Sequence, residues 1–170
     1  GSVIFAVACA TIDDPTGMIL INHDLTITGP GASALAISGD SVTGIFSIAA
    51  GAAVTITGLT LKDGVGINGG AIANDGNLTL SDDSFSGNSA STGGGAVYST
   101  GKVSSSNDTY AGNTANGGRG GAIYSTGSMT TANDTFTSNA ASTDGGAIGA
   151  TAPVASSGDA FSANTDRKST

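Results

Sequence analysis

Short apolar stretches alternate with polar residues along the chain, and between residues 69 and 165 one arrangement returns four times. Each copy opens with a Gly-Gly-Ala-aliphatic tetrad. An aromatic residue follows at a fixed place in the copy, and an asparagine stands three positions after it. The tetrads begin at Gly69, Gly94, Gly120 and Gly145. Their even spacing, about 25 residues, is a period that indicates a solenoid of stacked coils.

Three stretches in each copy have the period of two that is typical of a β-strand, and Gly, Asn, Asp and Ser separate them. In the second copy these stretches contain Val97, the pair Val103 and Ser105, and Tyr110. The pattern predicts an all-β fold, a right-handed single-stranded parallel β-helix (β-solenoid) with three short strands per rung and about six rungs of roughly 24–26 residues. Each strand then pairs with its copy in the next rung, ~4.8 Å along the axis.

Stacking of the copies predicts four columns of like residues inside the coil. They are an aliphatic column (Ile72, Val97, Ile123, Ile148), an aromatic column (Phe85, Tyr110, Phe136, Phe161), an asparagine column (Asn88, Asn113, Asn139, Asn164) and a glycine column (Gly70, Gly95, Gly121, Gly146). Asparagine tolerates a left-handed backbone and can hydrogen-bond along a stack, so it is predicted to build a bend. The glycines are predicted to leave room for bulky side chains opposite them.

Weaker copies precede the first tetrad. Val54 and Ile56 precede Leu78 and Leu80 by about one repeat length. By the same spacing, the pair Phe46 and Ile48 is predicted to match the pair Gly70 and Ile72. The whole chain, 1–170, is predicted to be a single β-helix domain, with an N-terminal cap at 1–17, degenerate rungs over 18–68, four regular rungs over 69–165 and a short tail at 166–170.

The composition supports a β-rich domain and limits its partners. The chain contains 28 Gly and no Glu or Gln, so it is poor in strong helix formers. Thirteen acidic residues against five basic ones give a net charge of −8, with no basic stripe, so we expect no nucleic-acid partner. No stretch reaches the ~18 apolar residues of a membrane-spanning helix, and no transmembrane segment is expected in this chain.

The first apolar stretch, residues 3–10, contains the only cysteine, Cys9, which therefore has no intrachain disulfide partner. Three interpretations remain open for this stretch: a capping strand, the end of a signal peptide, or a lipoprotein-type site at Cys9. No basic segment precedes it, as a signal peptide would require.

The paired motifs Gly-Gly-Ala-Ile and Phe-x-x-Asn resemble the repeats of the chlamydial polymorphic outer membrane proteins. The segment Leu25-Thr26-Ile27-Thr28-Gly29-Pro30-Gly31 is similar to a wider group of bacterial right-handed parallel β-helix surface proteins, which share the architecture of pectate lyases. The resemblance covers roughly residues 25–165, and Tyr110 departs from it by standing where the motif has Phe. It implies export, display at the cell surface, and an adhesive or structural role.

Aspartates recur at one fixed place in each copy, two positions before the aromatic residue, at Asp83, Asp108, Asp134 and Asp159. Stacked carboxylates could bind Ca²⁺, which takes several oxygen ligands. Aspartate is equally typical of a bend in which its side chain accepts hydrogen bonds from nearby backbone amides. Apart from this possible Ca²⁺, no cofactor is expected.

Polysaccharide-cleaving β-helices combine several aspartates with a histidine and a basic pair. This chain offers Asp82 with Asp83, the run Asn164-Thr165-Asp166, the pair Arg167 and Lys168, and a single histidine, His23. Their order along the chain gives no convergence of carboxylates on one bond, which acid-base catalysis requires. The chain is therefore predicted to have no enzymatic activity, with a polysaccharide-binding or pectate-lyase-like polysaccharide-cleaving protein as the alternative. Tyr98 and Tyr124 are candidates for stacking on a sugar or on a partner.

Outward positions on two predicted strands carry small hydroxyl-bearing or alanine residues. They are Thr79/Ser81, Ser104/Ser106, Thr130/Ala132 and Ala155/Ser157 on one strand, and Ser84/Ser86, Thr109/Ala111, Thr135/Thr137 and Ala160/Ser162 on the other. Flat faces of this kind could bind ice or a crystalline glycan, or pack against another solenoid. An ice-binding protein is thus the second alternative.

The sequence predicts an extracellular or cell-surface structural or adhesive β-solenoid that self-assembles into fibres or arrays through its flat faces or open ends. Its expected partners are other copies of itself, or a host, cell-surface or glycan ligand.

Overall fold

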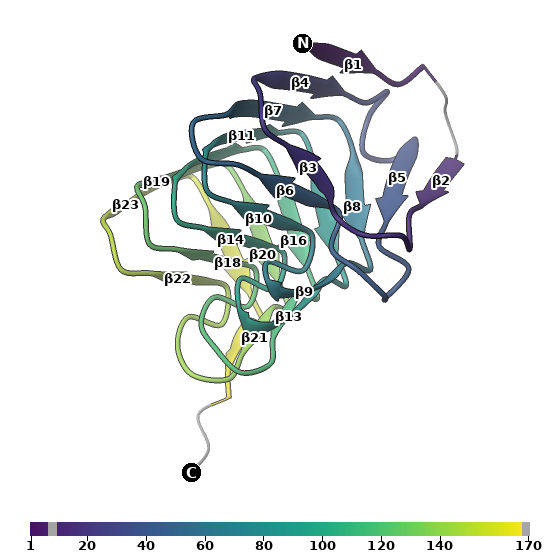
Figure 1. Cartoon of the computed structure of the whole chain (residues 1–170). Coiled ribbons are helices and arrows are strands. Elements are labelled where there is room, and N and C mark those ends of the chain that lie inside the picture. Colours follow the sequence, from purple (N-terminus) through teal and green to yellow (C-terminus); the bar gives the residue numbers. More distant parts are fainter. Residues whose placement is uncertain (7–9, 168–170) are drawn as a thin grey trace.

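The computed structural model describes residues 1–6 and 10–167. These residues form an all-β solenoid of about six turns in which every pair of neighbouring strands is parallel. Figure 1 shows the coils stacked from the N-terminal strands to the C-terminal ones. The described part of the chain contains no helix that is long and apolar enough to cross a membrane. Cys9 and the residues after Arg167 lie outside the described residues.

Two sheets run the length of the solenoid with seven strands each. Sheet A consists of β1 (Ser2–Ile4), β4 (Leu25–Thr28), β7 (Ala53–Thr57), β11 (Asn77–Ser81), β15 (Lys102–Ser106), β19 (Met129–Ala132) and β23 (Val154–Ser157). Sheet B consists of β2 (Ala10–Asp13), β5 (Leu35–Ser38), β8 (Thr60–Lys62), β12 (Ser84–Ser86), β16 (Thr109–Ala111), β20 (Thr135–Thr137) and β24 (Ala160–Ser162).

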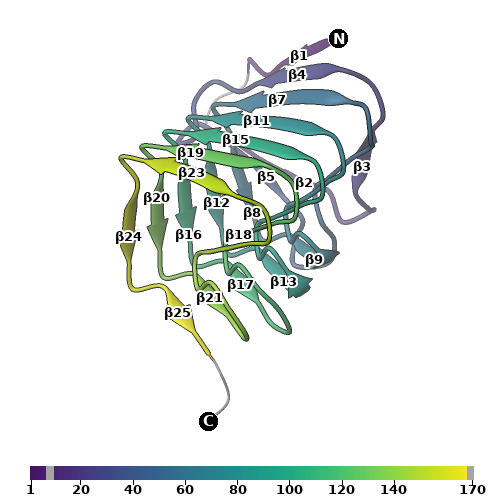
Figure 2. The same cartoon turned by 90° about the vertical axis from the view of Figure 1, so that its left-hand side faces the viewer.

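The other two sheets are shorter, with six and five strands. Sheet C consists of β3 (Ile19–Ile21), β6 (Phe46–Ile48), β10 (Ile72–Asn74), β14 (Val97–Ser99), β18 (Ile123–Ser125) and β22 (Ile148–Ala150). Sheet D consists of β9 (Val65–Asn68), β13 (Ser89–Gly93), β17 (Thr114–Ala115), β21 (Ala140–Ala141) and β25 (Thr165–Asp166). Figure 2 shows sheet D and its connecting loops projecting beside the other sheets.

The repeat pattern predicts three strands per coil, and sheets A, B and C supply them. Sheet D adds a fourth strand to the later coils, which the apolar pattern does not reveal. Its inward residues are small, such as Ala90, Ala115 and Ala141, and all three are buried. A strand whose buried side chains are all alanine lacks the large apolar alternation on which sequence prediction depends.

The predicted columns pair in register from β10 onward, since Ile72 pairs with Val97, Val97 with Ile123, and Ile123 with Ile148. The match of Phe46 to Gly70 is wrong, because Phe46 pairs with Ile72. Four residues separate β6 from β7, whereas two separate β10 from β11. The coil that contains β6 is therefore two residues longer at this bend. Because side chains alternate between the two faces of a strand, two extra residues leave the same face of each strand pointing inward.

Residues 1–6 and 10–17, which belong to the predicted N-terminal cap, contribute two strands to the solenoid. Within them, β1 pairs with β4 and β2 pairs with β5, so the segment continues the coil. Large apolar side chains remain exposed at this end, including Ile4 at 75% and Ile19 at 46%. At the other end, β25 includes Asp166, so the last coil extends one residue into the predicted tail.

A single apolar core fills the space between sheets A, B and C, and the aromatic column is its largest component. The rings of Phe85, Tyr110, Phe136 and Phe161 stack with centroids 4.8, 4.8 and 4.9 Å apart and planes within 7° of parallel. The separation equals the rise between neighbouring parallel strands, so strand pairing itself sets the stacking distance.

The two glycines of each tetrad are required for different structural reasons. The first adopts a left-handed backbone, with φ of +64° at Gly94, which side chains disfavour. The second, exemplified by Gly95, faces backbone: a Cβ there would lie 2.1 Å from the carbonyl oxygen of Gly121 and 2.5 Å from the amide nitrogen of Thr114. The prediction that these glycines make room for bulky side chains is therefore wrong, because they admit the backbones of the next coil and of sheet D.

Truncation of one central ring tests the contribution of the aromatic column. Phe136→Ala is expected to cost ~3–5 kcal/mol of unfolding free energy, because a fully buried ring stacked on both faces leaves a cavity. Phe161→Ala is the matched control, and its cost should be clearly smaller because that ring is 52% exposed and stacks on one neighbour. Urea unfolding measures both, and equal losses would contradict the proposed weight of the column.

Candidate functional site

Two bends of every regular coil follow one local plan, a left-handed residue followed by an inward Asp or Asn. At the bend from sheet A to sheet B the left-handed residues are Asp82, Asn107, Asn133 and Gly158, and the aspartate column follows them. At the bend from sheet B to sheet D they are Gly87, Gly112, Ser138 and Ala163, and the asparagine column follows. Gly, Asn and Asp reach the left-handed region most easily, and they occupy six of these eight places. Both columns are thus positioned by the turn chemistry.

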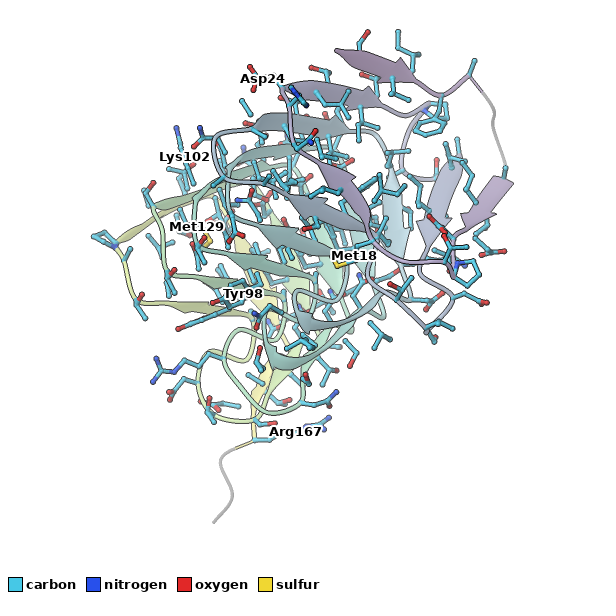
Figure 3. All side chains as sticks on the ribbon, in the orientation of Figure 1. Met18, Asp24, Tyr98, Lys102, Met129 and Arg167 are labelled. Carbon is cyan, nitrogen blue, oxygen red and sulfur yellow. The ribbon has the colours of Figure 1, made fainter. Side chains whose placement is uncertain are left out.

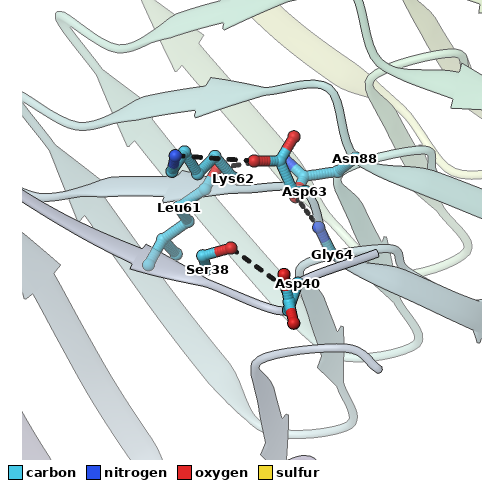
Figure 4. A network of polar contacts seen from close by, with 7 residues as sticks. All are labelled: Ser38, Asp40, Leu61, Lys62, Asp63, Gly64 and Asn88. Carbon is cyan, nitrogen blue, oxygen red and sulfur yellow. Dashed lines mark hydrogen bonds and ion pairs between the residues drawn. The ribbon is translucent and has the colours of Figure 1, made fainter. Parts of the chain in front are cut away.

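The asparagine side chains hydrogen-bond along their column, as the sequence predicts. The Nδ2 of Asn113 donates to the carbonyl oxygen of Phe85 at 3.0 Å and to the Oδ1 of Asn139 at 2.9 Å. Its own Oδ1 accepts from the backbone and side-chain nitrogens of Asn88 at 3.1 and 3.0 Å. Figure 4 shows Asn88 at the start of the column, bonded to Leu61 and Gly64. Each buried amide thus satisfies its donors and its acceptor.

The aspartates stack in the same way, but they lack amide donors. The Oδ1 of each accepts a 2.8 Å hydrogen bond from a backbone amide of the preceding coil: Leu59 to Asp83, Asp83 to Asp108, Asp108 to Asp134 and Asp134 to Asp159. Asp83, Asp108 and Asp134 are 1–2% exposed. Three carboxyl groups therefore lie in the interior, one per coil.

The second carboxyl oxygens differ from coil to coil. The Oδ2 of Asp108 accepts from the hydroxyl of Ser105 at 2.7 Å and from the amide of Ser106 at 3.2 Å. The Oδ2 of Asp159 accepts from the hydroxyls of Ser156 and Thr131. The Oδ2 atoms of Asp83 and Asp134 are buried and have no hydrogen-bond partner among the described residues. Hydroxyl groups therefore donate directly to Asp108 and Asp159, and the Ser105 hydroxyl also acts to lower the pKa of Asp134.

The pKa values follow these environments. Burial raises the pKa of Asp83 to about 8 and that of Asp108 to about 7, since desolvation outweighs the amides that donate to them. Burial also raises the pKa of Asp134. Burial acts against the charge of Asp159 as well, but the hydroxyls of Ser156 and Thr131 and the amide of Asp134 hold its pKa below the usual value.

Tyr110, the departure from the Phe motif, belongs to the aspartate site. Its hydroxyl lies 2.9 Å from the Oγ of Ser105, which in turn donates to Asp108. In the preceding coil the equivalents of Tyr110 and Ser105 are Phe85 and Leu80. Burial raises the pKa of Tyr110 well above its usual value, and the Asp108 charge acts in the same direction. One coil thus replaces two apolar side chains with a linked polar pair.

The structure contains a third polar column that the sequence pattern did not predict. Asn74, Ser99 and Ser125 are buried at the bend from sheet C to sheet A. The Nδ2 of Asn74 donates to Ser99 at 2.8 Å, and the hydroxyl of Ser99 donates to the carbonyl oxygen of Gly101. Their constant place two residues before Gly76, Gly101 and Gly127 was the available signal.

The geometry gives the aspartates no common point at which a cation would be held. Within residues 1–6 and 10–167, no three acidic, histidine or cysteine side chains are grouped closely enough for a metal ion. One oxygen of each aspartate is already bonded to a backbone amide. The structure thus lends no support to a metal on the column, and binding of Ca²⁺ there stays a prediction.

The residues considered for polysaccharide cleavage are dispersed. His23 lies on the first coil, where its Nδ1 contacts Asn22 at 2.6 Å, and its neighbour Asp24 is at the opposite end of the solenoid from Arg167 in Figure 3. Asp83 is buried and Asp82 is exposed on the bend before it. Thr165 and Asp166 belong to β25. The structure does not bring these groups together.

Tyr98 and Tyr124 lie side by side on the outer face of sheet C, with ring centroids 5.6 Å apart and planes tilted by 50°. Tyr124 fills the angle between sheet C and the sheet D loops, since a Cβ on either Gly93 or Gly149 would lie 3.2 Å from its ring. Beside it is a shallow hollow of about 320 Å³, lined by Thr92, Gly117, Gly118, Arg119, Tyr124 and Thr143. Packing accounts for the ring of Tyr124, and ligand binding by the pair stays a prediction.

The last described coil presents an open apolar end. Phe161 is 52% exposed and Val154 is 37% exposed. A hollow of about 460 Å³ opens among Ala147, Ile148, Ala150, Val154, Ser156, Phe161 and Asn164. Strands β22, β23, β24 and β25 are the outermost strands of their sheets here, so each presents an unpaired edge within the described chain.

The outer face of sheet A carries two columns of small residues. The first is Thr26, Thr55, Thr79, Ser104, Thr130 and Ala155, and the second is Thr28, Thr57, Ser81, Ser106, Ala132 and Ser157. Thr-x-Thr pairs therefore occupy β4 and β7, upstream of the regular repeats. Hydroxyls bond along the columns, as from Ser81 to Thr57 at 3.0 Å and from Thr130 to Ser104 at 3.1 Å.

Comparison with known families matches two segments, residues 84–100 and 135–151, to the Chlamydia polymorphic membrane protein repeat. Each segment runs from a sheet B strand through the asparagine bend and the glycine tetrad to a sheet C strand. The matched repeat is thus the unit that builds the sheet B to sheet C part of the coil. Searches of curated proteins and of solved structures found no match.

Removal of one asparagine tests the ladder. Asn113→Ala is expected to lower the unfolding free energy by at least about 3 kcal/mol, because it leaves the carbonyl of Phe85 and the donors of Asn88 without partners in the interior. Asn116→Ala is the matched control, since Asn116 is exposed and its side chain donates to Ser89 on the surface. Chemical denaturation followed by circular dichroism measures the difference, and similar values for both would refute the role of the ladder.

Proposed function

We propose that this chain is a non-catalytic, cell-surface structural or adhesive β-solenoid that associates end to end with further copies of itself. Two of its coils match the Chlamydia polymorphic membrane protein repeat, which supports placement at a membrane or cell surface. The observation that carries the association is the open last coil, with its half-exposed aromatic ring and four unpaired strand edges in the described chain.

The occupant that suits this end is another coil of parallel strands. Unpaired strand edges are templates for strand addition, and the exposed face of Phe161 offers the surface on which each earlier ring of the column stacks. The first coil has a matching apolar hollow of about 220 Å³, lined by residues that include Val3, Phe5, Ile12 and Ile19. Placing the last coil of one copy on the first coil of another keeps all strands parallel.

The two ends of the solenoid carry different charged residues. Asp13, Asp14 and Asp24 lie on or beside the first coil, and Arg167 follows the last strand. Because the two ends differ, the contact is heterologous, and repetition of it produces an open filament. A filament of this kind would extend the solenoid from a surface and present its long outer faces to a partner.

Light scattering across a range of protein concentrations tests the association. The wild-type chain is expected to form rods whose mass grows with concentration, and Phe161→Asp should shift growth to at least tenfold higher concentration. Val42→Asp is the matched control, because it adds the same charge at a residue that is 63% exposed away from the ends. A wild-type chain that stays monomeric at all concentrations, or equal effects of both variants, would sink the proposal.

The outer face of sheet A favours a second candidate, ice binding. Six successive strands carry hydroxyl-bearing or alanine residues at two outward columns, and Thr-x-Thr pairs stand on β4 and β7. A regular array of hydroxyl and methyl groups is suited to an ordered lattice.

Thermal hysteresis measures ice binding directly. If sheet A is the ice-binding face, the wild-type chain should depress the freezing point below the melting point. Thr55→Lys should abolish the effect, while Thr135→Lys on the outer face of sheet B should not. A chain without hysteresis removes this candidate.

A further inference from the structure

The aspartate column poses an electrostatic problem that the asparagine column does not. Asp83, Asp108 and Asp134 are almost completely buried and stacked in successive coils. Like carboxylates in a buried site cannot all ionise at ordinary cost, because each charge raises the energy of the next. The asparagine amides of the neighbouring bend are uncharged, and they donate hydrogen bonds to one another along the stack.

The groups around the column are acids. The ion pairs Lys62–Asp63 and Arg119–Asp144 lie elsewhere in the described fold. The titratable groups that face Asp83 are Asp82 on its own bend and Asp108 of the next coil. Asp134 faces Asp108, and Asp159 faces Asp134. Tyr110, packed against the column from sheet B, is also an acid.

A buried Oδ2 atom that lacks a hydrogen-bond partner favours the protonated, uncharged carboxyl group. A buried carboxylate oxygen without a donor carries a large desolvation cost, whereas a protonated carboxyl group has one fewer acceptor to satisfy. Those oxygens belong to Asp83 and Asp134, but the Ser105 hydroxyl still acts to lower the pKa of Asp134, whereas the donors that act on Asp83 are backbone amides only. The absence of a hydroxyl donor at Asp83 is local in origin, because Leu80 stands in its coil at the place from which Ser105 donates to Asp108.

We propose that the buried aspartate column is a proton-binding site, in which Asp83 keeps its proton at neutral pH, so that the stability of the solenoid depends on pH. A protonated aspartate here resembles the asparagine of the neighbouring bend.

The sign of the dependence follows from the pKa values. The unfolded chain loses these protons near the ordinary pKa of 3.8, whereas the folded chain holds the proton of Asp83 up to a pKa of about 8. Below pH ~4 both states are protonated, and above that the folded state binds more protons. Stability therefore falls as pH rises from about 4 to about 8. Each proton held changes the unfolding equilibrium constant about tenfold per pH unit.

The first experiment is a carbon NMR titration of the aspartate carboxyl groups in the folded chain. At least two carboxyl resonances are expected to titrate above pH 6, and those of the exposed aspartates near pH 4. Ser105→Ala, which removes a hydroxyl that lowers the pKa of both Asp108 and Asp134, should move both titrations upward. If every carboxyl group titrates below pH 5, the proposal is wrong.

The second experiment measures urea midpoints from pH 4.5 to 8.5 for two variants in one coil. Asp83→Asn should flatten the decline in stability, reducing the pH slope of the unfolding constant by about tenfold per pH unit. Asp82→Asn is the matched control: it removes the same charge from an exposed, left-handed position that is Asn107 and Asn133 in the next two coils. The same slope in both variants would overturn the proposal, and the titration decides it if Asp83→Asn does not fold.

Discussion

Stacking of coils in register is the constraint on which the rest of this structure depends. Each inward residue lies directly above its counterpart in the next coil, at the rise that parallel strand pairing imposes. A residue type is therefore repeated only if it can tolerate a neighbour of its own kind. Aliphatic side chains meet this condition by packing, and the aromatic rings meet it with centroids 4.8–4.9 Å apart. Asparagine meets it because one amide carries both donors and acceptors.

Aspartate meets this condition only if its second carboxyl oxygen has a hydrogen-bond donor or carries a proton. Its Oδ1 takes the same backbone hydrogen bond that asparagine takes, but its Oδ2 needs a hydroxyl, an amide or a proton. In the next coil, the serine that replaces Leu80 donates to Asp108, and the tyrosine that replaces Phe85 contacts that serine. The interior of the solenoid thus carries the carboxyl groups whose pKa values are raised by burial.

Much of the fold could be predicted because the repeat shows which residues are equivalent. Residues one repeat apart in the sequence, such as Ile72, Val97 and Ile123, pair with one another in neighbouring strands. The asparagines occupy the predicted bend. Sheet D was not predictable in the same way, because its buried residues are alanines without a large apolar contrast. The register of Phe46 was missed because a bend gained two residues, a change that leaves the inward pattern intact.

The candidate site was predicted only in part. The recurrence of Asp83, Asp108 and Asp134 was visible, but their burial and the differences among their donors depend on side chains from other coils. By itself, the sequence determined that the chain is a stack of like coils, because periodicity is a property of order along the chain. Only the tertiary structure decided which carboxyl oxygens lack a donor and which glycines meet backbone. Those properties arise from contacts between residues about one coil apart, whose distances the order of residues does not contain.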